Sequence, residues 1–189
     1  AQAMGNPAVV LAPGVVRIPT LGDFINSFAF TDLDGSVTLV DCGLGRAPAR
    51  IVAGLAHIGK HPRDVTRIIL THAHPDHAGG ASAMLHATGI EGVHAHEADA
   101  EYLRQGSAPP RDTSTTSGRI FARLPASGFS PVSVASELKH GDLIPVAGDV
   151  RVVHTPGHTP GHVSLLHEAS GVLITGDSIF NIASRRTWP

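Results

Sequence analysis

The chain has 189 residues, of which 42% are hydrophobic, and a formal net charge of −2. This length fits roughly one domain with a sizeable core, and we treat residues 1–189 as a single domain. The weak negative charge argues against a nucleic-acid partner, and no run approaches the ~20 apolar residues of a membrane span. The apolar run Val9–Val16 is short and lacks the basic start of a signal peptide. Cys42, the single cysteine, fits a reducing compartment, so we expect a cytoplasmic protein and leave its oligomeric state open.

The first half of the chain contains strand-like runs and then segments with helical spacing. The expected strands at the start are Val15–Ile18, Phe24–Phe30 and Ser36–Val40, with a turn at 32–35. The expected helices are Pro48–Ile58, Gly80–Thr88 and Glu97–Gln105. Further strand-like runs are Arg67–Leu70, Val150–Val153 and Val172–Thr175.

The segment from Gly106 to Pro131 is rich in Pro, Ser, Thr, Gly and Arg and has few apolar anchors. Loops longer than ~15 residues without regular structure are usually functional lids or disordered segments. We therefore predict that residues 106–131 form a mobile lid that covers a site and selects its ligand.

Three histidines and an aspartate fall within the six residues His72 to His77, directly after a strand-like run. Imidazole nitrogens and carboxylate oxygens suit Zn²⁺ and its neighbours. Isolated histidines elsewhere, such as His57, His86 and His140, are interpreted as structural. The density of this group instead indicates a metal-binding loop.

The spacing within this loop allows two adjacent ions. Residues two apart in an extended segment point to the same side, so His72 and His74 can share one ion. Pro75 turns the chain, which lets Asp76 and His77 point at a second ion.

Two later segments add candidate ligands. The stretch from His154 to His162 reads H-T-P-G-H-T-P-G-H, and its Pro-Gly pairs force turns that fix the direction of the histidines. Gly176 and Asp177 follow another strand-like run, where a carboxylate lies at a strand end. An isolated aspartate in this position is more often a turn or cap residue.

The motif H-x-H-x-D-H at His72–His77, the repeated T-P-G-H at Thr155–His162 and the pair Gly176-Asp177 occur in the same order as in metallo-β-lactamase fold hydrolases, which this chain resembles. The resemblance covers about residues 14–177. It implies an α+β fold, a four-layer αββα sandwich of two mixed sheets with helices outside. The dinuclear site would lie at one edge of the sandwich.

Carried over residue by residue, the resemblance implies a set of six metal ligands for about two Zn²⁺ ions per chain, with Fe or Mn as alternatives. One metal would be held by His72, His74 and His158, the other by Asp76 and His77, with Asp177 bridging both. The resemblance makes neither His154 nor His162 a ligand, so we expect them to shape the loop or to hydrogen-bond to ligands. Asp41 matches a family aspartate that supports the site, although a simple turn residue before Gly43 is an equal alternative.

The chain departs from the family pattern after His167, where no further histidine occurs. The second metal of the family normally receives a histidine from a strand near the C-terminus. We interpret the sequence as C-terminally truncated after Pro189, because a half-covered apolar sandwich would expose core surface. The alternative is a second site that is incomplete.

The chemistry implied by such a site is hydrolysis of a small molecule. Zinc lowers the pKa of bound water toward ~7, so a metal-bound hydroxide can attack a carbonyl at neutral pH. Asp76 would act as the catalytic residue by orienting the nucleophile and carrying its proton. No serine or cysteine nucleophile is required.

The bridging Asp177 resembles the glyoxalase II and lactonase branches, which favours a thioester, lactone or other ester bond. Phe180 stands where quorum-sensing lactonases carry a tyrosine, which counts against lactonase activity. Two other classes stay open. One is an iron-dependent persulfide dioxygenase, marked by one iron, and the other is a non-catalytic metal-binding module.

Overall fold

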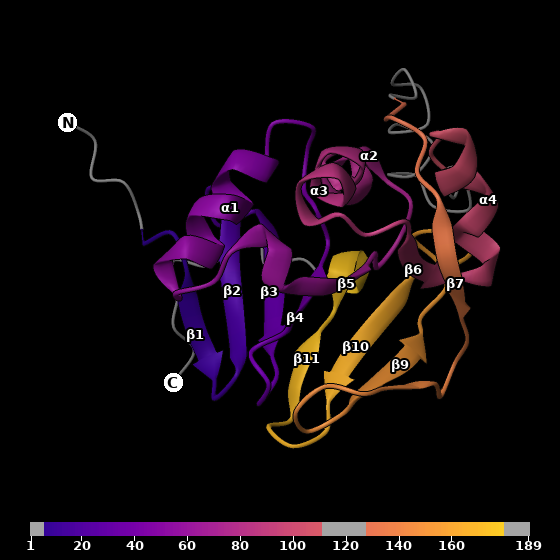
Figure 1. Cartoon of the computed structure of the whole chain (residues 1–189). Coiled ribbons are helices and arrows are strands. Elements are labelled where there is room, and N and C mark those ends of the chain that lie inside the picture. Colours follow the sequence, from indigo (N-terminus) through magenta and orange to yellow (C-terminus); the bar gives the residue numbers. More distant parts are fainter. Residues whose placement is uncertain (1–5, 111–127, 180–189) are drawn as a thin grey trace.

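In the computed structural model, the chain folds into two β-sheets that pack face to face, with helices on the outer side of the larger sheet (Figure 1). The structure describes residues 6–110 and 128–179. The larger sheet has seven strands in sequence order: β1 (Val9–Ala12), β2 (Val15–Leu21), β3 (Ile25–Thr31), β4 (Val37–Val40), β5 (Val65–Ile69), β6 (Val93–His96) and β7 (Val134–Leu138).

The larger sheet is mixed because its connections change along the chain. Short turns join β1 to β4, and these strands are antiparallel. Helices cross over between β4 and β6, and the strands from β4 to β7 are parallel. The turn predicted at 32–35 joins β3 to β4, where the amide of Gly35 donates to the carbonyl of Asp32 at 3.0 Å.

The smaller sheet has the strand order β11-β10-β9-β8 and is antiparallel throughout. Its strands are β8 (Leu143–Ile144), β9 (Val150–His154), β10 (Val163–His167) and β11 (Val172–Ile174). The expectation of two mixed sheets is therefore wrong for this sheet, because loops this short join only antiparallel neighbours.

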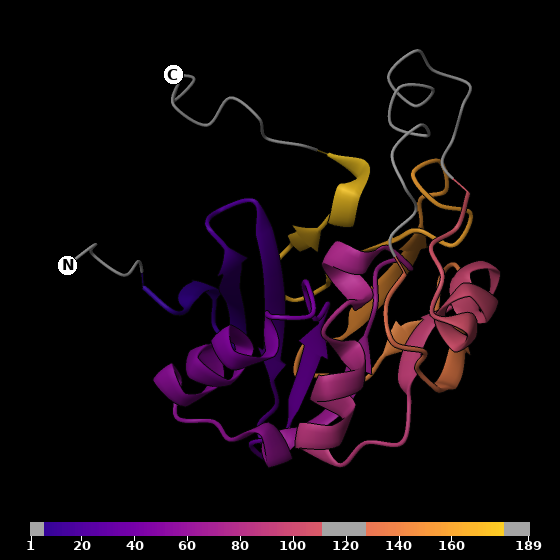
Figure 2. The ribbon, with the colours of Figure 1, turned by 90° about the horizontal axis from the view of Figure 1, so that it is seen from above.

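Four α-helices and two short 3₁₀ segments complete the described residues. They are α1 (Pro48–His57), η1 (Pro62–Asp64), α2 (Pro75–Ala78), α3 (Ala81–Thr88), α4 (Glu97–Gln105) and η2 (Gly176–Ser178). Seen from above, α1 and α3 lie on one side of the larger sheet and the smaller sheet lies on the other (Figure 2). The described part thus contains three of the four expected layers, and no helix within it covers the outer face of the smaller sheet.

Two hydrophobic cores hold these layers together. One lies between the helices and the larger sheet and includes Ile51, Leu55 and Ile68. The other lies between the two sheets and includes Phe30 and Leu165. Alternation along each strand explains the division, since successive side chains of a strand point to opposite faces.

The elements predicted from spacing agree with the structure to within one or two residues at most ends, including all three predicted helices. Strands β1, β6, β7, β8 and β10 were not predicted. In β6, for example, His94 and His96 alternate with apolar residues, and β7 carries Ser136 and Glu137. Pairing with neighbouring strands, rather than intrinsic preference, makes such segments strands.

The predicted lid falls largely outside the described residues, since 111–127 are not described. Its two ends are described and lie together: the amide of Phe129 donates to the carbonyl of Gly106 at 3.0 Å, at the end of α4. Phe180 and the residues that follow it also lie outside the described part. The lid function stays a prediction.

The fold brings the polar loops of both sheets to one edge. The parallel strands β4 and β5 are followed by Asp41 and by the loop that contains Thr71. In the smaller sheet β9 and β11 end at the same edge at which β10 begins, because both are antiparallel to β10. A backbone hydrogen bond joins the sheets there, with the amide of Val163 donating to the carbonyl of Thr71 at 2.9 Å.

None of the helices in residues 6–110 and 128–179 is both long and apolar enough to cross a membrane. The cytoplasmic location stays a prediction.

Replacement of Leu165 by Ala is expected to lower the free energy of unfolding by about 2–5 kcal/mol, because this side chain is fully buried between the sheets. Replacement of the next residue, Leu166, is the matched control, since Leu166 is only partly buried and points to the opposite face of the same strand. Urea unfolding of both variants measures the difference. Equal losses in the two variants would contradict a core between the two sheets.

Candidate metal centre

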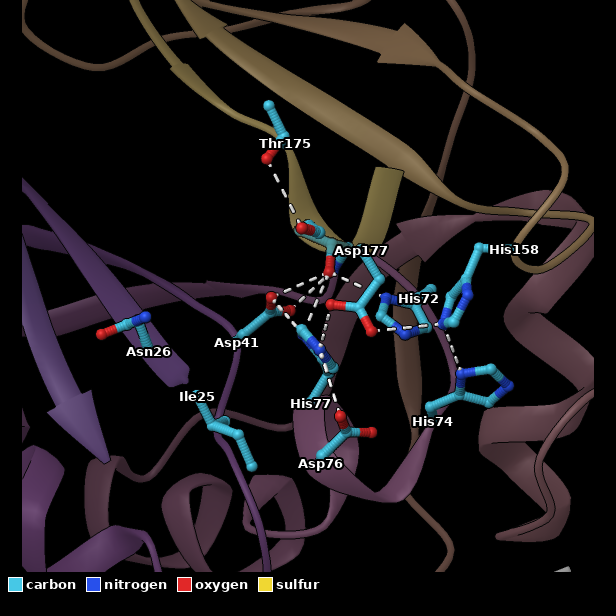
Figure 3. Close-up of polar contacts among 12 residues, drawn as sticks. Ile25, Asn26, Asp41, His72, His74, Asp76, His77, His158, Thr175 and Asp177 are labelled. Carbon is cyan, nitrogen blue, oxygen red and sulfur yellow. Dashed lines mark hydrogen bonds and ion pairs between the residues drawn. The ribbon is translucent and has the colours of Figure 1, made fainter. Parts of the chain in front are cut away.

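His72 lies at the centre of a group of imidazoles from both sheets (Figure 3). Its side chain is buried, and its ring centroid is 4.1 Å from that of His77, 4.8 Å from those of His74 and His158, and 5.0 Å from that of His162. Burial and the neighbouring imidazoles hold the pKa of His72 well below its usual value of 6.5. A buried, neutral imidazole is the form that binds metals.

The predicted ligands form two groups that share His72. In each group the ligand atoms lie within 4.8 Å of one another. One group is His72, His74 and His158, and the other is His72, Asp76 and His77. The first matches the set that the resemblance implied for one metal. The second adds His72 to the pair Asp76 and His77, so His72 lies within reach of both positions.

The donor set fits a zinc-class ion on two observations. Nε2 of His72 is buried and has no hydrogen-bond partner within the described part of the chain, a state that a coordinated ion would relieve. The set also combines neutral imidazoles with carboxylates, the ligands that Zn²⁺ and related ions take in proteins. The residues present therefore fit a metal of this class.

Asp177 touches both groups. Its Oδ1 is 3.0 Å from Nε2 of His77 and its Oδ2 is 3.3 Å from Nε2 of His158. The preceding Gly176 allows this placement: its φ is +49°, and a Cβ there would lie 2.6 Å from Nε2 of His162. The glycine of the G-D pair is thus required by the close packing of the carboxylate loop against a histidine.

His77 lies between two carboxylates. Its Nδ1 is 2.7 Å from Oδ2 of Asp41, and its Nε2 faces Asp177. Burial alone would lower the pKa of His77, but Asp41 and Asp177 raise it well above 6.5. Burial likewise would raise the pKa of Asp177, but its hydrogen bond to His77 lowers it. Without a metal, His77 is therefore protonated, and its positive charge is paired with the negative charges of Asp41 and Asp177.

Asp41 supports the site, as the resemblance implied, and is more than a turn residue. Besides His77 it accepts hydrogen bonds from Thr71, from the amide and from the hydroxyl, both at 2.8 Å. Its φ of 58° is unusual for a residue other than glycine. Asp41 thus joins the end of β4 to both ends of the H-x-H-x-D-H loop.

Asp76 lies in the first turn of α2, with Pro75 at the helix start, so the predicted turn after Pro75 is a short helix. Its Oδ2 is 3.6 Å from Nε2 of His77, and its side chain is 38% exposed. It is therefore the most accessible of the carboxylates at this edge, compared with 17% for Asp177 and 2% for Asp41.

The two histidines that were not expected to be ligands both make hydrogen bonds that shape the later loop. Nε2 of His162 accepts from the amide of Asp177 at 3.0 Å, and Nδ1 lies 2.8 Å from the hydroxyl of Thr155. The network thus assigns the proton of neutral His162 to Nδ1. Nε2 of His154 donates to the carbonyl of Pro160 at 2.8 Å. Its ring stacks on that of His96, with centroids 3.9 Å apart.

Two residues near the site were missed by the sequence interpretation. Thr71 bonds to Asp41, and Asp99 of α4 accepts hydrogen bonds from both histidine loops. Both are polar residues beside a predicted strand or helix end, where capping is the usual role. Only their burial distinguishes Thr71 and Asp99 from ordinary capping residues, since both are 0% exposed.

Comparison with known proteins identifies the family. The sequence profile of the Metallo-beta-lactamase superfamily matches residues 21–189, and the chain belongs to this superfamily. The fold agrees: a solved mutant of the HARLDQ-motif metallo-beta-lactamase from Cronobacter sakazakii (Enterobacter sakazakii) is 28% identical, with a TM-score of 0.73, over 89% of this chain and 62% of that one.

Two curated relatives bear on the chemistry. A hydroxyacylglutathione hydrolase from Cereibacter sphaeroides is 31% identical over 91% of this chain and 54% of its own length. An N-acyl homoserine lactonase from Bacillus sp is 35% identical over 69% of this chain and 45% of its own length. The chain thus spans about half the length of these relatives.

The titration of His162 gives a prediction for the metal-free protein. Burial, with the nearby His158, lowers the pKa of His162 to about 4, against 6.5 as its usual value. Between these values the unfolded chain binds the proton and the folded chain does not, so stability falls as the pH falls from 6.5 to 4. This residue contributes at most about 3 kcal/mol to that loss.

Urea unfolding of chelator-treated protein at several pH values between 6.5 and 4 measures this dependence. His162→Gln should show a shallower fall than the wild type, since glutamine can still accept from Asp177 but does not titrate. His86→Gln, at an exposed position of α3, should keep the wild-type slope. An unchanged slope in His162→Gln would contradict the assignment of a neutral, buried imidazole.

Proposed function

We propose that this chain carries the metal centre of a hydrolase that cleaves a thioester, lactone or other ester bond of a small molecule. About two zinc-class ions would be held by the six residues His72, His74, Asp76, His77, His158 and Asp177. Nucleic acid and membrane are not expected as partners. The observation that carries the proposal is the position of Asp177, whose two oxygens face one histidine of each ligand group.

Bound ions at this edge would polarise a carbonyl oxygen and lower the pKa of water toward ~7. The protein groups around the ions would orient the water and the metal-binding histidines. Asp76 has the exposure and the position to orient an attacking water and to take its proton on a carboxylate oxygen. Asp41 fixes the ring orientation of His77 through Nδ1, the role that carboxylates commonly have behind metal-binding histidines.

A hollow of about 480 Å³ lies beside these groups, within the usual size range of small-molecule sites. It is lined by Thr155, Pro156, Gly157, His158, Asp177 and Ser178. Pro156 and Gly157 offer apolar contact, and the hydroxyls of Thr155 and Ser178 offer hydrogen bonds. A substrate seated here would lie against His158 and Asp177.

The two named relatives support the choice of bond. One is called a hydroxyacylglutathione hydrolase and the other an N-acyl homoserine lactonase. By the chemistry of these names, hydrolysis of an acylglutathione cleaves a thioester, and hydrolysis of a lactone opens a cyclic ester. Both reactions attack an acyl carbon. The aligned share of each relative is about half, so the substrate itself is part of the proposal.

The test is metal analysis of the purified protein followed by a substrate panel. Zinc-loaded protein should contain about two ions per chain and hydrolyse at least one of a thioester, a lactone and a simple ester, with activity lost on chelation. His74→Ala should lose the first ion and the hydrolytic activity. The loss of activity should exceed roughly 10–100-fold, the usual effect of changing a residue that only hydrogen-bonds to a ligand.

Cys42→Ser is the control, because the thiol is fully buried in the core between helices and sheet. Its metal content should equal that of the wild type. One iron and no zinc would favour the dioxygenase alternative. Metal binding without hydrolysis of any panel member would favour a non-catalytic module.

A further inference from the structure

Asp99 is a fully buried carboxylate that no part of the proposed chemistry uses. It lies in the first turn of α4 and accepts three hydrogen bonds. Its Oδ2 accepts from the amide of Ala73 at 2.9 Å and from the hydroxyl of Thr159 at 2.7 Å. Its Oδ1 accepts from the amide of Gly161 at 2.7 Å. Both oxygens of the buried charge are thus engaged.

Two of the three donors lie next to the first group of candidate ligands in the sequence. Ala73 stands between His72 and His74, and Thr159 directly follows His158. The carboxylate therefore binds the chain beside all three histidines of that group. Two of these histidines come from the larger-sheet loop and one from the smaller-sheet loop, so Asp99 joins the loops that the metal would also join.

A capping role in α4 does not account for these contacts. The side-chain cap of α4 is His96, which accepts from the amide of Ala98 at 3.2 Å. The partners of Asp99 are instead 26, 60 and 62 residues away in the sequence. A buried carboxylate with three distant donors fixes their relative positions, because each lost bond leaves a buried group unsatisfied.

The close approach of the second loop explains its last glycine. A Cβ on Gly161 would lie 2.5 Å from the backbone nitrogen of Asp99 and 2.7 Å from its Cβ. Only glycine lets the loop come near enough for the hydrogen bond to Oδ1. The stacking of His96 on His154 adds a second contact between the start of α4 and the same loop.

We propose that Asp99 is the positioning residue of the first metal site, setting the separation of His158 from His72 and His74. This inference rests on the proposed function, since it concerns the same site. Metal affinity at the first site, and the geometry of the bound ion, should depend on Asp99 although it is not a ligand. Residues behind metal ligands typically change affinity by about 10–100-fold when altered.

The test compares Co²⁺ and Zn²⁺ binding by the purified protein and its variants. Asp99→Asn keeps the shape of the side chain but places an N–H₂ group against one of its donors. We expect about 10–100-fold weaker binding of the first ion, measured by competition with a chromophoric chelator, and an altered visible spectrum of the Co²⁺ form. Glu101→Gln, an exposed carboxylate of the same helix, should behave as the wild type.

A second pair of variants serves if Asp99→Asn does not fold. Thr159→Val removes the hydroxyl donor to Oδ2, and Thr159→Ser keeps it. Weaker binding and an altered Co²⁺ spectrum in the valine variant, both restored by serine, would support the inference. Equal affinity and spectra in the two variants, or a wild-type spectrum and affinity in folded Asp99→Asn, would overturn it.

The wild-type measurement separates this inference from the proposed function. A wild-type protein that binds neither Co²⁺ nor Zn²⁺ would overturn both. A wild-type protein that binds metal and hydrolyses substrate, with variants that bind equally well, would overturn the role of Asp99 alone.

Discussion

The structure depends on keeping several imidazoles together in a buried space. Charged imidazoles this close would repel one another, and burial penalises each charge further. Two arrangements meet this constraint. His72, His158 and His162 have lowered pKa values and stay neutral, while His77 keeps a proton between Asp41 and Asp177. A divalent ion would replace that proton with a larger positive charge, so the protein is electrostatically prepared for one.

The two-sheet architecture brings the candidate ligands to one edge of the molecule. They come from three chain segments. The parallel strands β4 and β5 deliver Asp41 and the H-x-H-x-D-H loop, and the smaller sheet delivers His158 and Asp177. The core between the sheets holds the two sources at a fixed distance, so packing far from the site determines its geometry.

Much of the candidate site could be predicted from the sequence because its candidate ligands are concentrated in short motifs bounded by glycine and proline. His72 to His77 and His154 to His162 can each be recognised locally. Asp99 could not, because its three bonds join residues 26 to 62 positions away and a single acid near a helix start looks like a cap. In the fold, the helices followed their 3.6-residue spacing. The short strand β6 was not predicted, because it has only four residues and its apolar side chains are Val93 and Ala95 alone. Its pairing with neighbouring strands makes it a strand.

The backbone hydrogen bond between Val163 and Thr71 has a consequence for how the molecule opens. Most amides of β10 bond within their own sheet, and their hydrogen exchange reports the unfolding of that sheet. The Val163 amide instead donates to the carbonyl of Thr71, in the loop that follows β5 of the larger sheet. Its exchange with solvent therefore reports the parting of the two sheets at the site, an event that can occur while each sheet keeps its own hydrogen bonds. The exchange rate of this one amide proton thus distinguishes separation of the sheets at the candidate metal centre from unfolding of the whole chain.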